Sequence, residues 1–160
     1  MIVFHVNNET QTLKLGQVIG QNLIPGMVIC LKGDLGAGKT TLTRGIVKGS
    51  GIGSHVTSPT FTIINEYEGK YKLYHIDTYR IESPDEMIDL GVENYLPAGD
   101  GVTVVEWPEL IEDLLPEDRL TLTIVSYGFH ERKIIVQVHG KNPSYEKLLQ
   151  ELKNHDSIGD

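Results

Sequence analysis

The chain has 160 residues, of which 39% are hydrophobic and 22% are charged, a composition that indicates one folded domain and excludes a disordered protein. Its 14 basic and 22 acidic residues give a net charge of −8, which argues against a protein that grips nucleic acid through its own phosphate contacts. One cysteine excludes an internal disulfide, and no apolar run approaches the roughly 20 residues that cross a bilayer. We therefore expect a cytoplasmic protein with no membrane contact, with one domain over residues 1–153 and a frayed tail over 154–160.

The first half of the chain alternates strands and helices. Residues 2–6 read as a short strand, and Asn8 is a good helix N-cap for the amphipathic segment that follows. The apolar run 27–31 predicts a buried strand, which a glycine-rich turn joins to a helix over 40–48. This half therefore contains a strand, loop and helix unit.

The second half is richer in strands. Residues 61–67 and 71–77 are separated by a three-residue turn with a central glycine, which predicts an antiparallel hairpin. A buried strand over 102–105 and a second strand pair follow, and helices are expected between and after them. The expected segments are a helix at 83–91, a helix at 109–115, strands at 120–125 and 133–138, and a helix at 143–152. The fold class is α/β: a single P-loop NTPase-like domain with a mixed, partly antiparallel sheet, the 27–31 strand at its centre and helices on both faces.

The turn after the central strand matches the phosphate-binding pattern G-x-x-x-x-G-K-[ST], with the required strand before it and helix after it. Glycines let backbone N–H groups turn toward an anion, and the helix N-terminus adds unpaired donors. Lys39 is then suited to the β- and γ-phosphates, and the Thr40 hydroxyl is a hard oxygen ligand for Mg²⁺. The residues expected to bind the nucleotide here are Asp34, Leu35, Gly36, Ala37, Gly38, Lys39, Thr40 and Thr41.

A P-loop also needs an acid for its metal, commonly at the end of a neighbouring strand. Asp77 and Glu106 each follow a strand segment, and the carboxyl ends of parallel strands meet at one edge of a sheet. His75 lies two positions before Asp77 and is either a buried structural histidine or a group that orients this acid. Trp107, the one tryptophan, either fills the core at a strand end, packs against the site or faces a partner.

The sequence lacks features that are typical of two classes of P-loop protein, GTPases and small-molecule kinases. The guanine-reading element N-K-x-D is absent, which argues against a GTPase. Small-molecule kinases close several arginines over the transferred phosphoryl group, whereas the four arginines here are scattered along the chain.

Four blocks of sequence, at 33–41, 57–61, 75–80 and 105–108, closely resemble the TsaE family of P-loop ATPases, also called the YjeE type. The blocks stand in the order of that family and span most of the chain. The resemblance implies an ATP-binding and ATP-hydrolysing accessory subunit, with Mg²⁺, that acts with the TsaB and TsaD proteins in forming threonylcarbamoyladenosine in tRNA. It implies contact with tRNA only indirectly, through the complex.

The resemblance also assigns roles to individual residues. It places Lys39, Thr40 and Thr41 on the phosphates and metal, with Glu106 as the metal-associated acid and Asp77 beside it. The catalytic group that it implies is Lys39, Asp77, Glu106 and Thr60, the last of which either senses the γ-phosphate or holds water, or else simply precedes a strand. It matches Glu9 and Arg132 to positions near the adenine base; the alternative is that both are ordinary surface charges.

Two alternative functions use the same loop. A stand-alone small-molecule kinase would turn over quickly only with its acceptor present, and a nucleotide-dependent binding module would hydrolyse ATP incidentally. A regulatory ATPase is instead expected to be slow alone and to respond to its protein partners.

Overall fold

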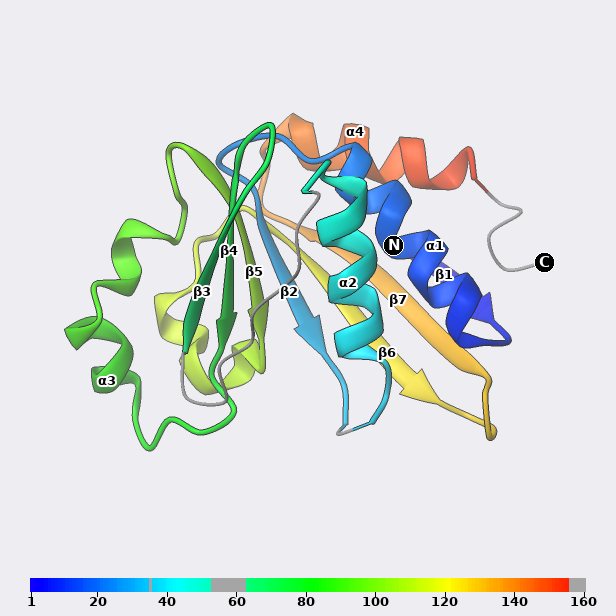
Figure 1. Cartoon of the computed structure of the whole chain (residues 1–160), viewed down its shortest axis with the longest axis horizontal. Helices are drawn as coiled ribbons and strands as arrows, with labels where there is room; N and C mark the ends of the chain where they lie inside the picture. Colours follow the sequence, from blue (N-terminus) through cyan, green and yellow to red (C-terminus); the bar gives the residue numbers. More distant parts are fainter. Residues whose placement is uncertain (35, 53–62, 156–160) are drawn as a thin grey trace.

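The computed structural model describes residues 1–34, 36–52 and 63–155 (Figure 1). Its elements, in chain order, are β1 (Ile2–Val6), α1 (Glu9–Gln21), β2 (Val28–Lys32), α2 (Lys39–Gly49), β3 (Ile64–Glu68), β4 (Lys72–Asp77), α3 (Pro84–Asp89), the 3₁₀ helix η1 (Val92–Asn94), β5 (Gly101–Glu106), the 3₁₀ helix η2 (Pro108–Leu114), β6 (Arg119–Ser126), β7 (Arg132–His139) and α4 (Pro143–Lys153). The strands form one sheet in the order β1-β7-β6-β2-β5-β4-β3. The predicted α/β fold is therefore confirmed, with the P-loop strand β2 in the middle of the sheet.

The sheet is mixed, with a parallel centre and antiparallel edges. Strand β2 pairs in parallel with both β5 and β6, and β4 pairs in parallel with β5. The β3–β4 and β6–β7 pairs are antiparallel, as the two predicted hairpins require, and β1 pairs antiparallel with β7. In the β4–β5 register Asp77 stands opposite Glu106, which brings the two predicted strand-end acids to the same edge as the loop after β2.

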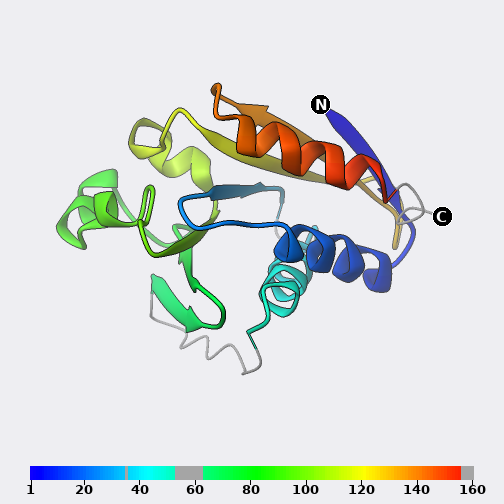
Figure 2. The same cartoon turned by 90° about the horizontal axis from the view of Figure 1, so that it is seen from above.

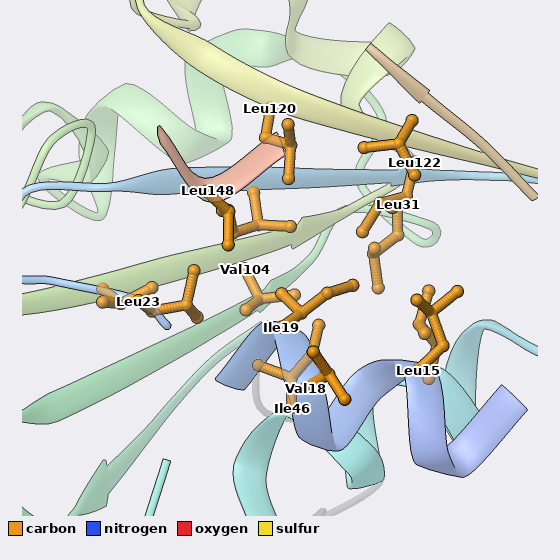
Figure 3. Packing of buried hydrophobic residues seen from close by; sticks show 14 of the residues in the cluster. Leu15, Val18, Ile19, Leu23, Leu31, Ile46, Val104, Leu120, Leu122 and Leu148 are labelled. Carbon is orange, nitrogen blue, oxygen red and sulfur yellow. The ribbon is translucent and has the colours of Figure 1, made fainter. Parts of the chain in front are cut away.

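Side chains of β2 alternate between two apolar clusters because successive residues of a strand face opposite sides of a sheet. Ile29 and Leu31 enter the larger cluster, to which α1, α2 and α4 contribute (Figure 3). Val28 and Cys30 enter the smaller one, which α3, η1 and η2 complete. Helical segments therefore supply both sides of the core, as expected, and Figure 2 shows α1 and α2 side by side below β2.

Helices α1 and α2 pack almost backbone to backbone. Each carries two glycines four residues apart, Gly16 and Gly20 in α1 and Gly45 and Gly49 in α2. A Cβ atom added to Gly16 would lie 2.6 Å from the carbonyl oxygen of Leu42, and one added to Gly45 would lie 2.9 Å from the Cα of Gly16. The helices run in the same direction, so the N-termini of both reach the edge of the sheet where the P-loop lies.

Two expected segments differ from the structure or extend beyond it. The helix expected at 109–115 is a 3₁₀ helix, η2, which is broken at Ile111 by φ −130° and ψ 32°. Residues 154 and 155 form a turn after α4, whereas 156–160 lie outside the described residues, so the frayed tail and the 1–153 boundary stay predictions. None of the helices in the described part of the chain is long and apolar enough to span a membrane.

Candidate functional site

The loop between β2 and α2 has the backbone geometry that an anion site requires. Gly36 and Gly38 have φ values of 80° and 117°, in the left-handed region that residues with a Cβ rarely adopt. Gly38 is also the N-cap of α2, and within the described residues no side-chain hydrogen bond caps the first turn, which begins at Lys39. The N–H groups of this turn and the positive end of the helix dipole therefore point toward the site.

Lys39 places a cation in the middle of this site. The residue is only 7% exposed, its Nζ donates a hydrogen bond of 2.6 Å to the carbonyl oxygen of Gly33, and Nζ lies 3.3 Å from the centroid of the Trp107 ring. Burial lowers the pKa of Lys39, and the nearby Glu106 carboxylate partly offsets this effect. The ammonium group is thus held by one carbonyl and one aromatic face, both neutral, and its charge remains available to a phosphate.

Glu106, at the end of β5, meets a histidine from the neighbouring strand. Glu106 is 7% exposed, and its Oε2 lies 3.0 Å from Nε2 of His75. The proposed contact between His75 and Asp77 is therefore replaced by one between His75 and Glu106. The reason lies in the neighbouring strand: Asp77 accepts a hydrogen bond of 3.0 Å from the N–H of Tyr79 in its own chain segment, while β5 supplies a second carboxylate within reach of the imidazole.

A cavity of about 320 Å³ brings together the predicted phosphate and metal residues. Its lining includes Lys39, Thr40, Thr41, Asp77 and Glu106. A hydroxyl and two carboxylates are hard oxygen donors of the kind that Mg²⁺ prefers, and they stand beside the cation of Lys39. These five residues, predicted from three separate parts of the sequence to hold phosphate and metal, thus line one cavity.

Trp107 closes one side of this cavity with an unusual backbone conformation. Its φ of 58° and ψ of 51° are left-handed, and it is the one non-glycine residue with positive φ in the described part of the chain. The hydroxyl of the fully buried Thr78 lies 2.6 Å from the Trp107 carbonyl oxygen and 3.0 Å from the Glu106 carbonyl oxygen. The rings of Tyr79 and Trp107 have centroids 5.0 Å apart, so the indole packs against the site rather than only in the core.

A second cavity, of about 240 Å³, lies on the other side of the P-loop. Glu9 and Arg132, the two residues matched to the adenine region, both line it together with Ala37 and Thr41. The Nε of Arg132 donates to the carbonyl oxygen of Ala37 at 2.9 Å, which ties β7 to the P-loop. The structure therefore places both predicted residues beside the P-loop. Glu9 and Arg132 lie too far apart in the sequence for a local motif to have shown that they are neighbours.

Three contacts at the site were not anticipated from the sequence. Arg44 pairs with Glu9 at 2.7 Å, and the Thr41 hydroxyl donates to the same Glu9 oxygen at 3.2 Å. Thr78 holds the Trp107 backbone as described above. Arg44 lies about one helical turn after Thr41, and residues at this spacing share a face of a helix. This spacing is the sequence feature that could have predicted the contact of Arg44 with Glu9.

Two of the predicted site residues, Leu35 and Thr60, lie outside the described residues. The roles assigned to them stay predictions. Asp34 is exposed and its carbonyl oxygen accepts a hydrogen bond of 3.0 Å from Ala37, so it shapes the loop through its backbone.

Comparison with known proteins identifies the family. The family model described as threonylcarbamoyl adenosine biosynthesis protein TsaE matches residues 6–134. The chain belongs to the TsaE family. The TsaE match runs from the end of β1 into the start of β7. It therefore includes every predicted site residue that lines either cavity, from Glu9 to Arg132.

Individual TsaE relatives cover nearly the whole chain. A Bacillus subtilis protein named tRNA threonylcarbamoyladenosine biosynthesis protein TsaE is 47% identical over 152 residues, which make up 94% of this chain and 93% of that protein. The protein of the same name from Haemophilus influenzae is 36% identical over 146 residues, with 86% of this chain and 92% of that protein covered. The crystal structure of Bacillus subtilis YdiB matches with a TM-score of 0.80 at 40% identity, over 97% of this chain and 95% of that chain. The resemblance seen in the four sequence blocks is therefore confirmed.

Proposed function

We propose that this chain is a cytoplasmic ATP-binding and ATP-hydrolysing accessory subunit of the machinery that forms threonylcarbamoyladenosine in tRNA. Its relatives carry the name of this biosynthesis. The observation that carries the proposal is the single cavity lined by Lys39, Thr40, Asp77 and Glu106 at the N-terminus of α2. This arrangement supplies a phosphate cradle, a cation and hard oxygen ligands in one place, as MgATP requires.

The two cavities divide the nucleotide between them in this proposal. The nucleoside would occupy the cavity lined by Glu9 and Arg132, and the phosphates would pass over the P-loop to Lys39. Thr40 and Glu106 would hold Mg²⁺, whose chemistry is to neutralise and orient phosphate oxygens, with Asp77 beside them. No cluster of three or more His, Cys, Asp or Glu side chains forms a metal cage within residues 1–34, 36–52 and 63–155, so the ion would take its other ligands from phosphate and water.

The placement of the arginines favours an ATPase over a small-molecule kinase. Arg44 pairs with Glu9, Arg119 donates to the carbonyl oxygen of Pro116 at 2.9 Å, and Arg132 donates to Ala37. These three guanidinium groups are therefore engaged away from the cavity that would hold the γ-phosphate and an acceptor. In this proposal water is the acceptor, and hydrolysis is expected to be slow in the isolated chain because these three arginines are held outside the cavity that would hold the γ-phosphate.

The partners in this proposal are the TsaB and TsaD proteins, and tRNA is reached only through them. A net charge of −8 disfavours direct binding to the phosphates of RNA. ATP binding at the P-loop would favour one state of the chain, and the partners would recognise that state.

The test is reconstitution with the purified chain, TsaB, TsaD and tRNA. We expect slow ATP hydrolysis by the chain alone, faster hydrolysis with both proteins, and threonylcarbamoyladenosine formation that requires ATP and Lys39. GTP in place of ATP and the Lys39→Ala variant are the controls. Modification that proceeds equally without this chain would overturn the proposed function, and rapid phosphorylation of a small acceptor by the chain alone would establish the kinase alternative.

A further inference from the structure

The backbone around Trp107 determines how two groups of the site face the cavity. The residue before it is Glu106, whose carboxylate lines the cavity, and its own ring lies against Nζ of Lys39 at 3.3 Å. A left-handed conformation is unfavourable for a residue with a bulky side chain, so surrounding contacts must hold it. The position of the indole and the direction of the Glu106 side chain therefore depend on what holds this turn.

Thr78 provides the contacts that hold the turn. Its hydroxyl lies within hydrogen-bond distance of two successive carbonyl oxygens, those of Glu106 and Trp107. Its backbone N–H donates to the Glu106 carbonyl oxygen at 3.3 Å as well. Thr78 is 0% exposed and its contact with the Glu106 carbonyl oxygen is buried, so removing the hydroxyl would leave that oxygen without this buried partner.

We propose that Thr78 is a positioning residue for the phosphate site, which acts through the backbone of Glu106 and Trp107. The hydroxyl fixes the left-handed turn, the turn sets the Trp107 ring against the Lys39 ammonium, and it aims the Glu106 carboxylate into the cavity. Thr78 itself does not line that cavity and has no contact with Lys39 among those described. This role of Thr78 deepens the proposed function, and the kinetic test of it rests on that function. The geometry that Thr78 controls is present without nucleotide, so it can also be tested by itself.

The spectroscopic test uses Trp107 as its own reporter, because it is the one tryptophan of the chain. Thr78→Val removes the hydroxyl while keeping the shape of the side chain, and Thr78→Ser keeps the hydroxyl. Thr103→Val is the matched control, since Thr103 is also fully buried and its hydroxyl donates to the carbonyl oxygen of Tyr95 at 2.6 Å, away from the site. Each variant is compared by indole emission, acrylamide quenching and thermal unfolding, without nucleotide.

We expect Thr78→Val to shift the emission to longer wavelength and to raise the quenching constant, whereas Thr78→Ser and Thr103→Val keep the emission of the unsubstituted chain. If Thr78→Val does not fold, Thr78→Ala serves instead, because it places no methyl group against the two carbonyls. Unchanged emission and quenching in a folded Thr78→Val or Thr78→Ala protein would overturn the proposal. So would an equal change in Thr103→Val, because it would reveal a general effect of losing a buried hydroxyl.

The kinetic test measures ATP hydrolysis by the same variants. We expect kcat to fall by about tenfold in Thr78→Val with a smaller change in KM, and Thr78→Ser to restore most of it, because the substitution displaces groups of the site without removing any. If the unsubstituted chain hydrolyses no ATP, the proposed function fails while the emission experiment still tests Thr78. If hydrolysis occurs and Thr78→Val leaves it unchanged, the positioning role fails and the proposed function stands.

Discussion

Nε2 of His75 and Oε2 of Glu106 lie 3.0 Å apart across the parallel strands β4 and β5. An ionised carboxylate only accepts hydrogen bonds, so when Glu106 is ionised the imidazole nitrogen is the donor in this pair. The contact fixes one Glu106 oxygen, and the Glu106 side chain lines the cavity beside Lys39. If Glu106 holds Mg²⁺ as we propose, His75 has the place of a group that orients a metal ligand.

We predict that His75→Ala lowers Mg²⁺-dependent hydrolysis by about 10- to 100-fold, the range typical of losing a group that orients a metal ligand. ATP binding is expected to weaken less, because Lys39 and the P-loop backbone remain. Steady-state hydrolysis across Mg²⁺ concentrations measures the effect. His155→Ala, beyond α4, is the control, and equal loss in both variants would contradict a specific role for His75.

Substitutions of Lys39 and Glu106 are predicted to affect different steps, nucleotide binding and ATP hydrolysis. Lys39→Ala should lose nucleotide affinity, because its role is to meet phosphate charge rather than to fill the core. Glu106→Gln keeps the shape and removes the charge, so hydrolysis should fall more than binding. Nucleotide titration and turnover rates distinguish the two.

Thermal unfolding provides a second measure of binding by these variants. Saturation at about 100 times the dissociation constant contributes about 2.7 kcal/mol, which corresponds to a rise in melting temperature of roughly 5 to 10 °C. Lys39→Ala should lose this rise, and Glu106→Gln should keep most of it. Hydrolysis at the full rate in Glu106→Gln would transfer the role of metal acid to Asp77.

Gly45→Ala should destabilise the fold, because the new Cβ would lie 2.9 Å from the Cα of Gly16 and would also meet the carbonyl oxygen of Leu13. Overpacking of this kind costs about 1–3 kcal/mol. Gly99→Ala is the matched control, since nothing lies within 4 Å of its added Cβ. Urea unfolding of both variants measures the difference, and equal stability would show that α1 and α2 can separate without cost.

Cys30 should be inert toward alkylation in the native protein. Burial raises the pKa of its thiol to about 12, and the thiolate is the reactive form. At pH 8 we therefore expect iodoacetamide to label the chain only after denaturation. Fast labelling of the folded chain at pH 8 would contradict the burial of this strand.

The same burial of Cys30 predicts a pH dependence of stability. Because the pKa of the Cys30 thiol is raised in the folded chain, the free energy of unfolding should decrease as the pH rises above about 9.

The sequence was most informative where the chemistry is local. The P-loop pattern lies in eight consecutive residues, 33–40, so the strand, loop and helix around it could be predicted from one motif. The rule that parallel strand ends share an edge placed Asp77 and Glu106 near it. The partner of His75 could not be predicted, because it depends on the register between two strands that lie 24 residues apart at their nearest ends, Asp77 and Gly101. The left-handed turn at Trp107 was also missed, since a tryptophan gives no signal for positive φ.

The glycine-packed helices have a consequence for how the nucleotide is recognised. Asn8 and Glu9 stand at the start of α1, Thr41 stands in the first turn of α2, and all three line the cavity of about 240 Å³. Because the backbones of α1 and α2 are in close contact at their glycines, folding sets the spacing between these side chains before any ligand is present. In the proposed function, the entropy cost of bringing these side chains together is therefore already met when the chain folds and not when ATP binds.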